Sequence, residues 1–196
     1  MSDHHNQVAE DQVHLLGPLE VTVDDFASSG YILDIGGGGE GVIGRLKGEQ
    51  VIAIDHLKQE LEEAAPGPLK IVMDAGNMQF LDNTFHTATA FFSFMFIKRD
   101  SHLKVFREIF RVLAPGGRFL IWDVALPARS DQSKIIVGFP LLVKLPGGEI
   151  STGYGTRWPE QEQGFAYYKQ LAQEAGFRVI KEQENKPLFY MELQKP

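Results

Sequence analysis

The chain has no cysteine among its 196 residues. This absence excludes disulfide bonds, thiolate metal sites and any mechanism with a covalent cysteine. Basic residues are in the minority: 19 Lys and Arg stand against 26 Asp and Glu, for a formal net charge of −7. Non-specific nucleic-acid binding needs clustered Lys and Arg. We therefore expect no nucleic-acid partner and no metal centre.

Long apolar runs are also missing. The run 91–97 is too short to cross a bilayer. Residues 1–16 have neither the basic start nor the apolar core of a signal peptide. We expect no membrane partner and a cytoplasmic protein. The length suits a single domain over 1–196, with a polar tail and small cap at 1–29 and a hairpin insertion at 125–158.

The most informative stretch that is present covers residues 32–41. A short apolar strand runs directly into four consecutive glycines, and helix-forming residues follow. Glycine lets the backbone turn sharply and lets a ligand approach without a Cβ in the way. A strand, a glycine turn and a helix N-terminus together form a cradle for a nucleotide.

Strand-like and helix-like segments alternate behind this loop, which predicts a mostly parallel sheet with helices on both faces. Strands are expected at 31–35, 50–54, 69–73, 87–92 and 118–124, and helices at 40–47, 56–65 and 101–113. Two strands at 135–145 and 150–154 then flank a hairpin turn at 146–148. A helix at 160–175 closed by Gly176 and an antiparallel pair at 177–184 and 188–194 complete the prediction.

Acidic residues end three successive predicted strands: Asp34, Asp55 and Asp74. In an open α/β sheet the ligand crevice lies beyond the carboxyl ends of the strands. Asp55 follows the glycine turn by about 20 residues, the spacing at which a carboxylate reaches two ribose hydroxyls. The alternative interpretation is that these acids simply end strands and cap the following helices.

Four blocks in this order resemble the class I S-adenosylmethionine-dependent methyltransferases, especially the small-molecule branch that includes ubiquinone/menaquinone-type enzymes. The blocks are 32–41, 51–55, 73–85 and 107–119. The expected fold is an α/β, Rossmann-like, seven-stranded sheet in the order 3-2-1-4-5-7-6 with strand seven antiparallel. A β-hairpin insertion is expected after strand 5.

The resemblance implies a site for S-adenosylmethionine. The methionine end would meet Asp34, the backbone of Gly36 and Gly38, and the backbone of Ala90 or Phe91. The adenosine would meet Asp55 on the ribose, His56 beside it, Asp74 and the Ala75 N–H on the adenine, and Met78 on its edge. The turn at 115–117 would be structural.

Glu40 departs from the family, because it occupies the usual place of the last glycine of the loop. Its carboxylate could pair with the amino group of the cofactor, or it could cap the short helix that follows. Met95 and Phe96 stand where many relatives carry histidines, which predicts an apolar site floor.

Methyl transfer needs chiefly in-line positioning, so the catalytic residues stay unknown and a general base is optional. His102 is near the right place but is better interpreted as a first-turn helix residue. The predicted acceptor is a small molecule, methylated on O, N or carbon. Two alternatives stay open: a nicotinamide-dependent oxidoreductase and a non-catalytic cofactor-binding or interaction module.

The nearly continuous apolar runs of the segment 134–154 need a partner surface. We expect the hairpin to wall the acceptor pocket. A homodimer contact is the second hypothesis, and packing on the chain's own core is the third.

Overall fold

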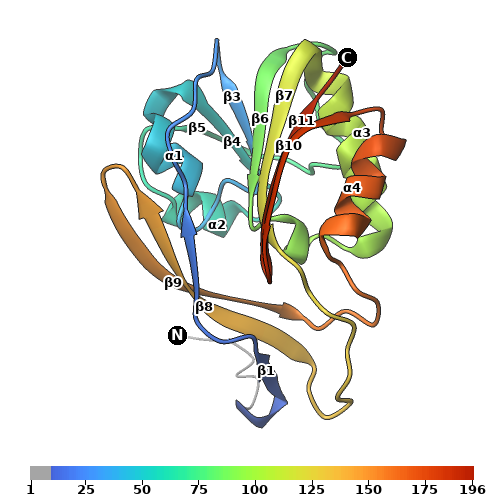
Figure 1. Cartoon of the computed structure of the whole chain (residues 1–196). Coiled ribbons are helices and arrows are strands. Elements are labelled where there is room, and N and C mark those ends of the chain that lie inside the picture. The colour runs from blue at the N-terminus through green and yellow to red at the C-terminus, as the bar shows by residue number, and fades with distance from the viewer. Residues whose placement is uncertain (1–9) are drawn as a thin grey trace.

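The structure is a computed structural model that describes residues 10–196, so the first nine residues of the expected polar tail lie outside it. Its main sheet is seven-stranded, in the order β10-β11-β7-β6-β3-β4-β5 (Figure 1). The strands are β3 (Ile32–Ile35), β4 (Val51–Asp55), β5 (Leu69–Val72), β6 (Phe85–Phe91), β7 (Leu113–Val124), β10 (Arg178–Asn185) and β11 (Leu188–Gln194).

Five neighbouring strands are parallel to one another: β5, β4, β3, β6 and β7. The strand β11 runs antiparallel to both β7 and β10. Numbered along the chain within this sheet, the order reads 3-2-1-4-5-7-6. All four residues of β3 are buried, because the strand lies in the middle of a sheet covered on both faces. The α/β fold class expected from the alternation is confirmed.

Helices cover the two faces of this sheet (Figure 1). The helices α3 (His102–Val112) and α4 (Phe165–Glu174) enclose one core cluster, which contains Leu33 and Phe106. On the opposite face, α1 (Val42–Lys47) and α2 (Lys58–Glu63) contribute to a second cluster, which contains Ile32 and Val51. Short 3-10 turns complete the fold: η1 (Glu10–Gln12), η2 (Gly48–Gln50), η3 (Phe94–Phe96) and η4 (Arg99–Ser101).

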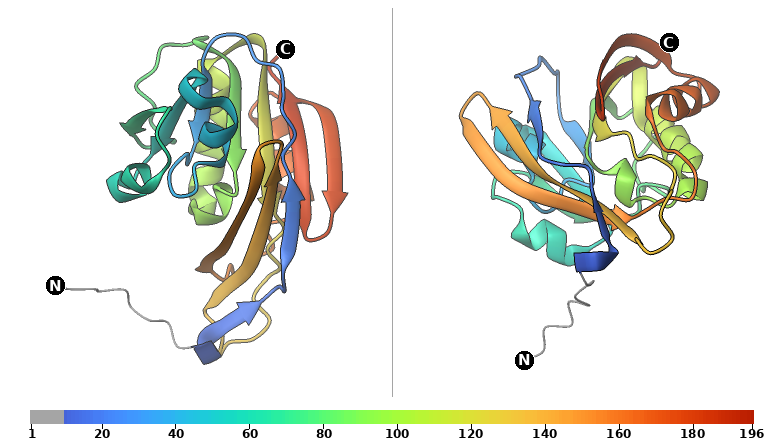
Figure 2. Two further views of the ribbon diagram at one scale, coloured as in Figure 1. Left: turned by 90° about the vertical axis from the view of Figure 1, so that its left-hand side faces the viewer. Right: turned by 60° about the horizontal axis from the view of Figure 1, so that its bottom comes forward.

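A second, four-stranded sheet is built from β1 (Val13–Leu15), β2 (Leu19–Thr22), β8 (Ile136–Leu145) and β9 (Gly148–Arg157). The strand β8 pairs with β1 and β2 in parallel and with β9 antiparallel along its whole length. Alternate side chains of β8 are buried with residues at the ends of β6 and β7. Figure 2 shows this sheet beyond one end of the main sheet.

The second sheet corrects two expectations. The region 1–29 is not only a tail and small cap, since residues 13–15 and 19–22 form strands. The hairpin is not isolated either, because β1 and β2 pair with it and its apolar face is buried against the chain's own core. The third hypothesis for the hairpin therefore describes its packing.

Smaller corrections concern the element ends. The turn at 115–117 lies within the bounds of β7 rather than before it, and Gly116 there has φ of 78°. Its N–H donates to the carbonyl of Lys195, so the turn binds the C-terminal segment. Ser101 precedes α3, but its side chain makes no capping hydrogen bond. The helix α4 starts later than predicted and β9 is longer.

Candidate functional site

The glycine loop follows β3 at the carboxyl edge of the main sheet. The N–H groups of Gly36 and Gly37 donate to the carbonyl of Ile54 at 2.8 and 3.1 Å, which ties the loop to β4. Gly36 has φ of 69°, a backbone conformation that favours glycine. A Cβ on Gly38 would lie 2.5 Å from Cβ of Glu60, so this glycine is needed for close contact with α2.

Four carboxylates surround this loop. A Cβ built on Gly37 would lie 2.7 Å from Oδ2 of Asp34, and one built on Gly38 would lie 3.0 Å from Oδ2 of Asp55. A Cβ built on Gly39 would lie 3.2 Å from Oε2 of Glu60. Glu40 is the next residue along the chain. Within residues 10–196, none of the four carboxylates forms an ion pair with a lysine or an arginine.

Burial dominates the electrostatics of two of these acids. Asp34 is almost wholly buried, and this raises the pKa of its carboxyl to about 7, although Oδ1 accepts a hydrogen bond from Thr89 at 2.7 Å. Burial also raises the pKa of Glu60, and the nearby acids Glu63, Asp55 and Glu40 add to the effect. A cation at this edge would stabilise the ionised form of both groups.

The expected adenosine residues lie at the end of β4, just after it, and in the loop after β5. Asp55 ends β4, and its Oδ1 accepts the N–H of Leu57 at 2.9 Å while Nδ1 of His56 lies 3.5 Å away. Asp74 accepts the N–H of Gly76 at 2.8 Å, so part of its role is to fix the turn that contains Ala75. Met78 is buried in the core cluster that also contains residues of α3.

Residues at the end of β6 pass beneath the glycine loop. Ala90 and Phe91 are buried, and Ala90 pairs in register with Ile35. Phe92 follows with φ of 49°, a rare conformation for a bulky residue and a sign of local strain. Its N–H donates to the carbonyl of Trp122 at 2.8 Å, and Ser93 Oγ donates to the carbonyl of Ile35 at 2.6 Å.

The strand β9 contacts the glycine loop directly. Both carboxylate oxygens of Glu40 accept hydroxyl groups from β9: Thr152 donates to Oε1, and Tyr154 donates to Oε2 at 2.8 Å. Two residues on, Thr156 Oγ1 donates to the carbonyl of Met95 at 2.9 Å. The second sheet therefore covers the edge where the sequence places the cofactor.

Two buried titratable groups lie near this edge. The ring of His102 is fully enclosed, with Nε2 near the carbonyls of Phe94 and Ile97 at 3.1 and 3.0 Å. Burial lowers its pKa, so it is a neutral structural residue, as the sequence favoured. Burial raises the pKa of the Asp123 carboxyl to about 7, and this carboxyl accepts the N–H groups of Phe94 and Val124.

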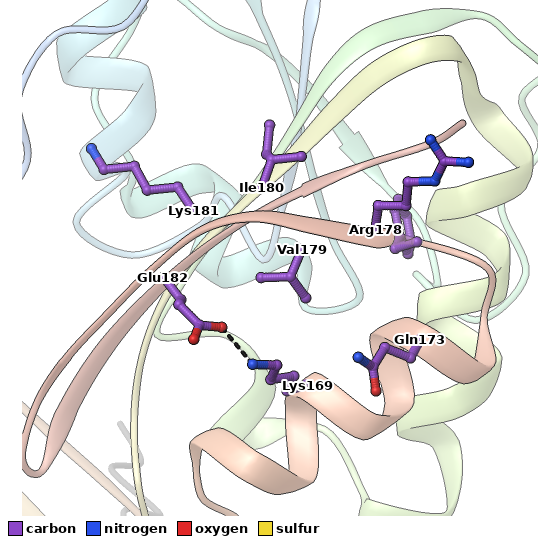
Figure 3. Close-up of a pocket in the computed structure, with 8 residues that line it drawn as sticks. Lys169, Gln173, Arg178, Val179, Ile180, Lys181 and Glu182 are labelled. Carbon is purple, nitrogen blue, oxygen red and sulfur yellow. Dashed lines mark hydrogen bonds and ion pairs between the residues drawn. The ribbon is translucent and has the colours of Figure 1, made fainter.

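Two surface hollows lie away from the loop. One of about 720 Å³ lies between α4 and β10, where Lys169 and Glu182 form an ion pair at 2.7 Å (Figure 3). It is at the far edge of the sheet, with β11, β7 and β6 between β10 and β3. The other, of about 380 Å³, includes Gly76 and Asn77, immediately after the Asp74 turn. Neither hollow is lined by residues of the glycine loop.

Residues 33–121 match the family described as "Methyltransferase domain". The chain is 34% identical over 106 residues to a ubiquinone/menaquinone biosynthesis C-methyltransferase of Desulfotalea psychrophila, covering 49% of this chain and 42% of the relative. It is 29% identical over 118 residues to the mitochondrial 2-methoxy-6-polyprenyl-1,4-benzoquinol methylase of Drosophila melanogaster, covering 55% of this chain and 37% of the relative.

Solved structures agree on the fold. An S-adenosylmethionine-dependent methyltransferase of Mesorhizobium loti gives a TM-score of 0.61 at 15% identity, covering 86% of this chain and 93% of that one. The [4+2]-cyclase SpnF gives 0.60 at 14% identity, covering 86% and 75%. Since one neighbour is named a cyclase, the fold by itself does not define the reaction.

Residues 33–121 thus match a methyltransferase domain, and the fold is shared with a solved S-adenosylmethionine-dependent methyltransferase over most of the chain. The expected family resemblance is confirmed, and the comparisons support S-adenosylmethionine as the cofactor. The chain spans less than half the length of the two curated relatives described above. No helix in residues 10–196 is both long enough and apolar enough to span a membrane.

Sequence reasoning missed three contributors to this edge: Glu60, Thr152 and Asp123. Glu60 could have been noticed, because it is an acid in the first turn of the helix that follows Asp55. Asp123 also carries a signal, as an acid inside the apolar run of a central strand. The contact of Thr152 with Glu40 has no local signal, since it joins residues 112 positions apart.

Proposed function

We propose that this chain transfers the methyl group of S-adenosylmethionine to a small-molecule acceptor by in-line displacement. The observation that carries the proposal is the glycine loop lined by Asp34, Glu40, Asp55 and Glu60. S-adenosylmethionine has a sulfonium and an ammonium group, and both are favoured beside carboxylates. A dinucleotide would instead place an anionic pyrophosphate at the same edge, which these carboxylates repel.

In this proposal Asp55 binds the ribose and Asp34, with the backbone of Gly36 and Gly38, holds the methionine end. The Oδ1 atom of Asp55 accepts the Leu57 N–H, and Oδ2 faces Gly38, which supports a ribose contact on that side. His56, Ala75, Asp74, Met78, Ala90 and Phe91 keep the roles expected from the family. The bound cofactor supplies an electrophilic methyl group.

The chain's own contribution to rate is positioning and exclusion of water. Aromatic side chains of both sheets meet beside the loop: Phe92 lies 5.6 Å from Tyr154 and 5.9 Å from Phe139 between ring centroids. Proximity and orientation supply much of the rate in such transfers. The curated relatives are named for quinone and sterol substrates, and we propose an apolar acceptor on that basis.

The remaining expectations stay proposals. They are a single methyltransferase domain over the chain, a cytoplasmic location, no nucleic-acid or membrane partner, and self-association through residues 134–154. The buried face of β8 leaves few apolar side chains for a dimer contact, among them Ile135, which is 39% exposed.

Titration calorimetry with S-adenosylhomocysteine and with NAD tests the proposal. We expect S-adenosylhomocysteine to bind and NAD not to bind. The Asp55→Ala variant should bind about tenfold or more weakly, because a charged acceptor of hydrogen bonds contributes about 1.5–3 kcal/mol. Asp24→Ala, an exposed acid outside the loop, serves as the control.

Each other outcome overturns the proposal in a defined way. Binding of NAD alone would make the chain a nicotinamide-dependent oxidoreductase, and binding of neither ligand would favour an interaction module. Wild-type affinity in Asp55→Ala would refute the ribose assignment. Transfer of a labelled methyl group to a panel of quinols and sterols then tests the acceptor class.

A further inference from the structure

The strand β9 presents a row of three hydroxyl groups to the main domain. They belong to Thr152, Tyr154 and Thr156, which alternate along the strand and therefore share one face. All three are half-buried, while Ser151, Gly153 and Gly155 between them are exposed. The polar groups of β9 thus point at the site, and small residues face outward.

Two of these hydroxyls bind the same carboxylate. Thr152 and Tyr154 donate to different oxygens of Glu40, so they fix both its position and the plane of its carboxyl group. Burial and the charge of Glu40 raise the pKa of the Tyr154 phenol, which keeps it protonated as a donor. Hydrogen bonds to an ionised acceptor are about twice as strong as neutral ones.

Apolar contacts of Tyr154 add to these two hydrogen bonds, and together they form the junction between β9 and the main domain. The ring of Tyr154 packs edge-on against Phe96 of η3 and close to Phe92, the strained residue after β6. Phe96 is 50% exposed at the rim of this contact. The junction therefore links the glycine loop, β9 and the end of β6, which are the three segments that border the proposed cofactor site.

We propose that Thr152 and Tyr154 are positioning residues that act through Glu40 and hold the second sheet closed over the bound cofactor. The proposal rests on the proposed function for the identity of the cofactor. Because the second sheet covers the loop, cofactor entry and exit require these two hydrogen bonds to break. Their loss should speed cofactor release more than it alters the chemical step.

The absence of cysteine allows a direct test by spin labelling. Labels at Lys58→Cys on α2 and Gly153→Cys on β9 report the separation of the second sheet from the site. Both positions are exposed, and a Cβ at Gly153 meets its nearest contact at 3.7 Å. The distance distribution is measured by pulsed electron resonance without cofactor, in the starting chain and in the Thr152→Val/Tyr154→Phe double variant.

We expect the double variant to show a broader and longer distance distribution. Dissociation of S-adenosylhomocysteine should be at least about tenfold faster, by the magnitude of charged hydrogen bonds. The KM for S-adenosylmethionine should rise with little change in kcat. Thr152→Ser alone should dissociate S-adenosylhomocysteine as slowly as the wild type, since serine keeps the hydroxyl group.

Tyr190→Phe is the matched control, because the Tyr190 hydroxyl donates to Glu192 at 3.3 Å within the main sheet. It should leave both measurements unchanged. Glu40→Gln provides a second route if the double variant fails to fold, and it should give the same loosening. If the folded variants show an unchanged label-to-label distance and an unchanged dissociation rate, the proposed role of Thr152 and Tyr154 is refuted. If the wild-type chain does not bind S-adenosylhomocysteine, the proposed function is refuted instead. The label-to-label distances then still test whether Thr152 and Tyr154 hold the second sheet closed.

Discussion

Replacing Asp34 with asparagine should stabilise the protein at alkaline pH while it weakens cofactor binding. Asp34 is buried at the end of β3 and has no cationic partner among residues 10–196. Its one side-chain hydrogen bond comes from Thr89, and an asparagine oxygen can accept that bond equally well. Asp34→Asn therefore removes a buried charge and keeps the shape.

The direction of the pH dependence follows from the pKa of the Asp34 carboxyl, which burial raises from 3.8 to about 7. The stability associated with the protonated carboxyl is fully present below about pH 4 and is lost as pH rises through 7. The difference between the two pKa values converts to at most about 4 kcal/mol. Relaxation around the buried charge reduces this, so we expect a gain of about 1–3 kcal/mol for Asp34→Asn at pH 8.

Urea unfolding at pH 5 and pH 8 measures this gain. The advantage of Asp34→Asn over wild type should be larger at pH 8, and the exposed control Asp24→Asn should show no such trend. Calorimetry at pH 8 should show weaker binding of S-adenosylmethionine by the Asp34 variant, because the carboxylate no longer faces the ammonium group. A gain that does not change with pH, or a loss that grows with pH, would refute the reasoning.

Two further predictions concern the glycine loop and the buried histidine. Gly38→Ala should weaken cofactor binding at least about tenfold, because its Cβ would lie 2.5 Å from Cβ of Glu60 and must displace α2, whereas Gly147→Ala meets nothing within 4 Å and should be neutral by the same calorimetry. His102 has a pKa lowered by burial, so its contribution to stability is present above about pH 6.5 and is lost as pH falls. The acid-side decline in unfolding free energy should therefore be smaller in His102→Gln, and an identical decline would contradict this assignment.

The main sheet was predictable because its signals are local. Apolar runs such as 51–54 and 188–193 alternate with amphipathic helices, and Gly176 has the positive φ expected of a glycine that ends a helix. The strands β1 and β2 were missed because they are short and pair with residues more than a hundred positions away. Val13, for example, pairs with Ile136. Periodicity within three residues cannot show such a partner.

The acids of the candidate site could be predicted from the sequence, but the contact of β9 with the glycine loop could not. The acids that end strands follow from sequence alone, since parallel strands bring their carboxyl ends to one edge. The conformation of Phe92 has no sequence signal, because a bulky residue with positive φ depends on surrounding contacts such as its N–H bond to Trp122. The covering of Glu40 by β9 likewise depends on how two sheets pack.

The chain treats its acids in two different ways, and the contrast supports a functional interpretation of the glycine loop. Elsewhere, partly buried acids have arginine partners: Glu108 bonds Arg111 at 2.8 Å and Glu192 bonds Arg118 at 2.6 Å. The carboxylates around the loop have none within the described chain, although two of them have pKa values raised by burial. If these acids served stability alone, a nearby cation would improve the fold. In the proposed function, leaving them without one lowers stability and keeps their charge for the cationic cofactor.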